Sequence, residues 1–260
     1  MPAGYTHYIF GEQVLDQLDE NIKKRIMPYI DLYHIGIHGP DILFYYDVYK
    51  KNPVKSLGFG MHQLPANSFF KHAKELIKQD ATDATLAYTI GFITHFTLDS
   101  SLHPEIGVLE NTLSMTHSLL ESELDRELLV RVGKDPLTAN LTTHIHPDYT
   151  NAQVIAPFFD LKAEEVDKAL HDLLFILKWL VAPTKLKRSF VLSVMKLGGM
   201  YEEYKGLLIN YEKDEHAAND INHLIEMKDE AVPLAVSLIN EYVGHLDDDY
   251  LNERFNRNYE

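Results

Sequence analysis

Apolar residues recur at spacings of three and four along most of the chain, whereas alternating runs bounded by turn residues are hard to find. A repeat of this kind is typical of amphipathic helices, so the sequence predicts an all-α fold. The expected helices cover residues 6–18, 21 onward with an interruption at Pro28, 66–78, 81–102, 113–132, 163–180, 186–210, 215–228 and 231–245.

Glycine and proline mark the expected breaks between these helices. Gly36, Gly39 and Pro40 lie within five residues of one another, which predicts irregular structure over residues 33–41. Functional side chains are often presented from such breaks. Longer loops are expected at residues 50–65 and 133–148.

The second half of the sequence predicts helices that support the fold rather than a functional site. Its helices, over residues 149–246, are amphipathic, and Pro233 falls in the first turn of the last one, where proline is tolerated. The acidic tail from Asp247 is expected to be solvated. No Gly-, Ser- or Pro-rich linker divides the sequence, so we expect residues 1–260 to form a single all-α domain.

Residues 91–121 combine polar and apolar positions in a pattern that predicts a functional site. Successive helical residues are rotated by about 100°, so His95, Asp99 and His103 share one face of the expected helix. The neighbouring positions are largely apolar, which indicates that this helix is buried. A buried face with two imidazoles and a carboxylate is costly unless each group is hydrogen-bonded or bound to a cation.

A second pair of the same chemistry follows. Pro104 is expected to end the helix in a short loop, after which His117 and Glu121 are again four residues apart. Imidazole and carboxylate are ligands that suit Zn²⁺. Any one of these residues alone could belong to a hydrogen-bonded core network, but the full set at these spacings favours a metal site.

Other histidines carry weaker signals. His72 lies on a polar stretch and is expected at the surface. The Thr143-His144-Ile145-His146 segment could form a weak chelate, but two histidines in a loop are more often solvated, so we expect solvent exposure there.

Composition narrows the range of partners. The chain has 260 residues, 45% of them hydrophobic, and a formal net charge of −15. That charge repels the phosphates of long nucleic acids and the anionic face of a membrane at long range, so a phosphate ester would need a local cationic centre such as a metal cluster.

Residue types and segments that the sequence lacks exclude several kinds of site and location. With zero cysteines, the chain has no disulfide, thiolate zinc site or thiol nucleophile. The first ten residues lack a basic segment and a long apolar run, so no signal peptide is expected and a cytoplasmic location is predicted. The longest apolar window, residues 173–181, contains Lys178 and is too short to span a bilayer, so no transmembrane segment is expected.

Several short motifs occur together in one order. They are THxxxG at residues 6–11, GPD at 39–41, FGMH at 59–62, HxxxDxxxH at 95–103 and THSxxE at 116–121. As a set they resemble the zinc-dependent phospholipase C family, which is related in fold to S1/P1-type nucleases. The resemblance implies a multi-helix bundle with a buried multinuclear metal site whose ligands lie within residues 7–121.

The resemblance also implies which residues bind metal. Asp41, His62, His95 and Asp99 would hold one zinc ion, with Asp99 bridging to a neighbouring ion. Another zinc ion would be held by His103, His117 and Glu121.

A third ion would bind His7 and Asp99. In the family this ion is completed by an N-terminal tryptophan, whereas this chain begins with Met1 and Pro2. The third position would then be weak or filled by another side chain, and His38 and His34 are the candidates. We favour His38, which is three residues from Asp41; alternatively, it only hydrogen-bonds a ligand carboxylate.

The implied reaction is phosphodiester hydrolysis. Clustered Zn²⁺ lowers the pKa of a bound water and stabilises the leaving alkoxide, and Asp41 would act as ligand and general base. The substrate would be a phospholipid or a small phosphodiester. Phe59 matches an aromatic of choline-preferring members, but Ile42 stands where those members have tyrosine, so choline preference is not implied.

Three other functions stay open. A nuclease or nucleotidase could use the same cluster, although the negative charge disfavours long strands. A metal-binding protein of the same fold could lack turnover. The adjacent His171 and Asp172 are compatible with an HD-type phosphohydrolase, but they lie far along the chain from the other histidines.

Overall fold

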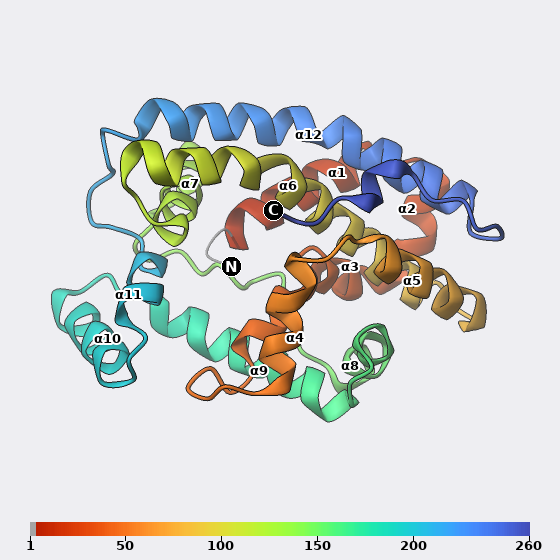
Figure 1. Ribbon diagram of the computed structural model, residues 1–260, viewed down its shortest axis with the longest axis horizontal. Helices are drawn as coiled ribbons and strands as arrows, with labels where there is room; N and C mark the ends of the chain where they lie inside the picture. The colour runs from red at the N-terminus through yellow and green to blue at the C-terminus, as the bar shows by residue number, and fades with distance from the viewer. Residues whose placement is uncertain (1–3) are drawn as a thin grey trace.

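The computed structural model describes residues 4–260, and within that range every regular element is helical (Figure 1). The all-α prediction is therefore confirmed. The α-helices are α1 (Gly4–Gln17), α2 (Glu20–Ile26), α3 (Ile30–Gly36), α4 (Pro53–His62), α5 (Asn67–Gln79), α6 (Ala84–Leu113), α7 (His117–Arg131), α8 (Tyr149–Ile155), α9 (Ala163–Leu180), α10 (Lys185–Leu197), α11 (Tyr201–Tyr204) and α12 (Ala218–Gly244). None of the described helices has the combination of length and apolarity needed to cross a membrane.

Helix α6 is the centre of the bundle. Every residue from Ala84 to Ser100 is buried, so this part of the helix has no solvent-facing side. It packs mainly against α3 and α12, with α1 and α5 alongside. Figure 1 shows α12 running along the outside of the α6–α7 layer. Because no side of this part of the helix faces solvent, its polar side chains must find their partners inside the protein.

Two glycines let α3 approach α6 closely. A Cβ atom at Gly36 would lie 2.4 Å from the carbonyl oxygen of Tyr88, and one at Gly91 would lie 2.3 Å from that of Tyr33. Any side chain at either position would push the helices apart. The close packing brings the turn after α3, a 3-10 helix over Gly39–Tyr45 (η2), against the part of α6 that carries His95.

Pro104 does not end α6, contrary to the sequence prediction. The helix continues to Leu113, and the loop that follows is short. A proline inside a helix leaves the carbonyl four residues earlier without its usual donor. Here Arg254 replaces that donor: its Nη2 donates to the Ser100 carbonyl oxygen at 3.0 Å.

The predicted loop at residues 50–65 is also wrong, because it contains α4. Asn52 caps this helix by accepting a hydrogen bond from the Lys55 backbone N–H at 2.8 Å, and Pro53 occupies the first turn. Proline at that position is pre-organised for a helix, and Gly58 only lowers the helical propensity.

Two boundaries in the second half differ from expectation as well. The helix predicted over residues 186–210 is divided after α10, where Gly199 has a φ of +70°. The two helices predicted over 215–245 are one helix, α12, with Pro233 in its interior. Pro233 and Asp229 are both exposed, so water can solvate the carbonyl that the proline leaves free.

The chain after α12 is only partly solvated. Its acidic residues Asp247 to Asp249 are exposed as predicted, but Phe255 and Tyr259 are each 1% exposed. Figure 1 shows this segment running back to the middle of the molecule. The tail therefore belongs to the core.

We expect Arg254→Ala to lower the free energy of unfolding by roughly 1–3 kcal/mol, because it leaves the Ser100 carbonyl without a donor. In a Pro104→Ala background the same change should cost less, since alanine at that position restores the backbone N–H. Urea denaturation of the four proteins in this cycle, with Arg257→Ala as an exposed control, measures the difference. An equal loss in both backgrounds would contradict the assigned role.

Candidate metal centre

Five elements deliver polar side chains to one open cleft of about 530 Å³. The cleft is lined by His7 from α1, Asp41 from η2, His62 at the end of α4, Asp99 and His103 from α6, and His117 and Glu121 from α7. His95 is completely buried behind it. The sequence-predicted ligands over residues 7–121 thus lie together.

Asp99 is at the centre of this group. Its Oδ1 lies 3.2 Å from His7 Nε2 and 3.7 Å from His103 Nε2. Its Oδ2 lies 2.9 Å from His95 Nε2 and 3.7 Å from His62 Nε2. One buried carboxylate therefore faces four imidazoles, two on each oxygen.

Three sets of donor atoms are compact enough to hold an ion, each with all its atoms within 4.8 Å of one another. They are His7 with His95 and Asp99; Asp41 with His62 and His95; and His103 with His117 and Glu121. The first two sets share His95 and are fully buried. The third is partly open, because the His117 side chain is 39% exposed.

Whether these residues suit a metal ion can be judged from buried polar atoms that lack a hydrogen-bond partner. Among the described residues, His7 Nδ1, both ring nitrogens of His95, His103 Nδ1 and Glu121 Oε2 are buried with no hydrogen-bond partner. His95 Nε2 approaches Asp99 closely yet is not aligned for a hydrogen bond. Buried polar atoms are normally satisfied. These unpaired atoms belong to four residues of the three donor sets, and imidazole and carboxylate groups suit coordination of zinc.

The electrostatic field of the cleft favours positive charge. Burial disfavours the charged imidazole of His103, but the carboxylates of Asp99 and Glu121 outweigh it and raise the pKa of His103 to about 9. Burial likewise opposes ionisation of Glu121, yet His117 and His103 hold the pKa of this carboxyl far below its usual range. A field that stabilises imidazolium stabilises a dication in the same place.

A comparison with known families agrees with this chemistry. The family model described as zinc dependent phospholipase C matches residues 6–173, which is more than half of the chain. The chain belongs to the zinc-dependent phospholipase C family. The buried His and Asp clusters fit the zinc dependence of that family. No match was found to a curated protein or to a solved structure.

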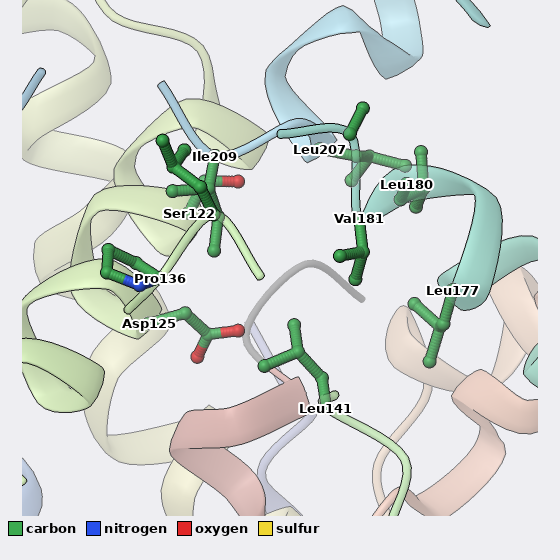
Figure 2. Close-up of a pocket in the computed structure, with 11 residues that line it drawn as sticks. Ser122, Asp125, Pro136, Leu141, Leu177, Leu180, Val181, Leu207 and Ile209 are labelled. Atoms are coloured by element: carbon green, nitrogen blue, oxygen red, sulfur yellow. The ribbon is translucent and has the colours of Figure 1, made fainter. Parts of the chain in front are cut away.

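In this phospholipase C family member, Asp125 fixes the start of α1. Its carboxylate accepts hydrogen bonds from the Thr6 backbone N–H and hydroxyl, both at 2.7 Å, and from the Tyr5 N–H at 3.2 Å. Asp125 lies one turn after Glu121 on α7, and Figure 2 shows its carboxylate extending away from Pro136, toward the side where Leu141 lies. No pattern in the sequence indicated this anchor, which holds the residue next to His7.

The additional ligand candidates lie beside the three sets, not in them. The Nε2 atom of His38 is 2.7 Å from that of His144, and its ring centroid is 6.4 Å from that of His7. The Nε2 atom of His34 is 3.0 Å from Glu12 Oε1. A metal role for His38 or His34 stays a prediction.

The solvated loop expected at residues 143–147 is half wrong. His146 is exposed and its Nδ1 lies 2.9 Å from an Asp31 carboxylate oxygen. His144, however, is only 5% exposed and stacks on Tyr8 with 4.1 Å between ring centroids. The loop buries this histidine because an aromatic ring of α1 and the imidazole of His38 offer it partners that sequence spacing does not reveal.

Three other sequence candidates lie outside the metal sets. His72 is exposed as predicted, and its Nε2 lies 2.9 Å from the Pro157 carbonyl oxygen. His171 is also exposed, and Asp172 accepts a hydrogen bond from Lys168 on the same helix. The structure therefore does not favour an HD-type site.

One aromatic beside the ligands was missed from the sequence. The Tyr259 ring lies 5.1 Å from the His62 ring and 6.0 Å from the His95 ring, measured between centroids. Burial, followed by the charges of Asp99 and Asp41, holds the pKa of Tyr259 well above its ordinary value. It stays a neutral phenol that covers the ligands, and no motif in the tail indicated this.

We expect Asp99→Asn to reduce the zinc content of the purified protein, since the change removes the one charge that faces four imidazoles while keeping the side-chain shape. His72→Ala is the control, because His72 is exposed and outside all three sets. Elemental analysis of both variants at neutral pH measures the effect. Equal zinc content would show that Asp99 is not central.

Asp125→Asn should destabilise the protein by about 2–4 kcal/mol, because an amide cannot accept all three of the N–H and O–H donors of α1. It should also weaken metal binding through His7. Glu127→Ala on the same helix, which loses only a surface pair with Arg131, is the matched control. Chemical denaturation gives the first effect and elemental analysis the second; no difference from the control would contradict the anchoring role.

Proposed function

We propose that the protein is a zinc-dependent phosphodiesterase that cleaves phospholipids in the manner of a phospholipase C. Its family implies a hydrolase with a phospholipid-type substrate. The observation that carries the proposal is that the three donor sets lie around one open cleft, with Asp99 facing four of their imidazoles. We further propose that this cleft holds at least two zinc ions, and a third if the set containing His7 is filled.

The roles of the residues follow from their burial. Zinc, when bound, polarises a phosphoryl oxygen and lowers the pKa of a coordinated water. Asp41, His62, His95 and Asp99 would form the more deeply buried part of the centre, with His95 fully enclosed and the other three at the wall of the cleft. The open set that includes His117 faces the solvent and would admit the substrate phosphate.

Asp41 is the proposed general base. Burial opposes its ionisation, but His62, whose Nε2 is 2.9 Å from Asp41 Oδ1, helps to keep its pKa below the usual range. The carboxylate is therefore ionised at neutral pH and able to orient a water and accept its proton. It lines the cleft, so the water does not need to reach a buried position.

The walls of the cleft support a lipid-like substrate without defining its headgroup. Phe44 and Phe59 stack with 4.1 Å between their ring centroids, and both line the cleft. Ile42, next to the proposed base, is completely buried and offers no contact to a headgroup. A preference for choline is therefore not part of the proposal.

We expect hydrolysis of the phosphodiesters p-nitrophenyl phosphocholine and bis-p-nitrophenyl phosphate, its loss on chelation and its return with Zn²⁺. Asp41→Asn should lower the rate by about a hundredfold or more, whereas His72→Ala should not change it. Chelation should also lower the melting temperature, since metal binds the native state. Cleavage of p-nitrophenyl phosphate alone would favour a nucleotidase, and bound zinc without any turnover would favour a non-catalytic protein.

A further inference from the structure

The C-terminal half of α9 and one side of α10 carry large apolar side chains that face solvent. We call this surface the α9–α10 face; its residues, with their exposed fractions, are Phe175 (63%), Trp179 (40%), Leu186 (83%), Phe190 (56%), Val194 (48%) and Leu197 (91%). The Trp179 ring lies 6.2 Å from Phe175 and 5.9 Å from Phe190, between centroids. The two helices therefore present one continuous surface, at a corner of the molecule in Figure 1.

Helix α10 is apolar on two sides, and only one of them is covered. Val191 and Met195 pack inward against Ala182 and Leu208 in a small separate core. The residues of the α9–α10 face on α10 follow a helical stripe on another side. Contiguous exposed apolar surface of this kind marks an interaction site.

The charge around this face is opposite to that of the whole chain. Residues 173–200 contain five Lys and Arg residues and no Asp or Glu, although the net charge of the protein is −15. Lys178 and Lys185 form no ion pair with any of the residues that the structure describes, and each is next in sequence to a residue of the α9–α10 face. Basic residues beside exposed Trp, Phe and Leu are the composition of a segment that lies in a membrane interface.

An apolar pocket adjoins the metal cleft on the inner side of the two helices that carry the face, and none of the residues of the face lines it. Ile176 and Leu180 of α9 and Met195 of α10 line one side of it. Phe44 and Phe59 line the other side, and these two rings also line the cleft that contains the metal ligands. An acyl chain in this pocket would leave the attached phosphate next to the cleft.

We propose that the α9–α10 face docks on an anionic lipid surface and that the adjoining pocket takes an acyl chain of the bound lipid. The second part rests on the proposed function; the first does not. A lipid surface fits better than a second copy of the chain, because two copies meeting through this face would bring their basic residues together. The net charge does not prevent docking, because charges farther away than about 8 Å are largely screened at physiological ionic strength.

Trp179 provides a direct probe, because it is the only tryptophan in the chain. Its fluorescence should shift to the blue on mixing with vesicles of equal parts phosphatidylcholine and phosphatidylserine, more than with phosphatidylcholine alone, and salt should weaken the response. The measurement is repeated with Asp41→Asn, so that lipid cleavage does not alter the vesicles. Absence of a shift with the mixed vesicles would overturn docking.

Double variants separate the contribution of the apolar side chains to vesicle binding from that of the basic side chains. Phe190→Ser with Leu197→Ser should weaken vesicle binding by about tenfold or more, and so should Lys178→Glu with Lys185→Glu. Val130→Ser with Val132→Ser removes comparably exposed apolar groups from the end of α7 and should change binding by less than about twofold. Equal losses in the test and control pairs would overturn the assignment.

Other outcomes distinguish failure of the docking proposal from failure of the proposed function. Vesicle binding without cleavage of the soluble diesters would support docking and refute the proposed function, whereas cleavage without binding would do the reverse. A doubled mass in sedimentation, with a Trp179 spectrum that depends on protein concentration in the absence of lipid, would make the face a contact between copies and overturn docking.

Discussion

A single buried carboxylate, facing imidazoles on both of its oxygens, is the constraint on which this structure depends. Asp99 has a relative exposure of 3%, and its neighbours come from α1, α4 and α6. Such a group is tolerated in a core only if it is hydrogen-bonded or paired with a cation. The anchoring of α1 by Asp125 holds the chain beside His7, and the close approach of α3 to α6 places Asp41 of η2 in the same cleft.

The fold class and the polar face of the central helix were accessible from the sequence for one reason. His95, Asp99 and His103 repeat at the helical period inside an apolar segment, and both the periodicity and the cost of burying polar groups are local properties. The spacing of His117 and Glu121 adds the same signal. Local reasoning therefore predicted that these residues of α6 and α7 share one polar site, and the structure places them in one cleft or directly behind it.

Features that depend on distant partners could not be predicted in this way. Pro104 indicates a helix end unless one knows that Arg254, far along the chain, supplies the missing donor. His144 is expected in solvent unless Tyr8 and His38 are placed beside it. Tyr259 carries no motif at all, and only the return of the tail to the core places it over the ligands.

The return of the tail has a consequence for how the protein assembles. Arg254 completes α6, and Tyr259 covers His62 and His95, while His7 enters the same centre from the other end of the sequence. Contacts between such distant segments close large loops, and chains dominated by them fold slowly. We therefore expect the side chains of α6 and α7, which are close in sequence, to come together before His7 and Tyr259 join them. Zinc captured by a partly folded chain would therefore be exchangeable, and it would be enclosed only when both ends have docked.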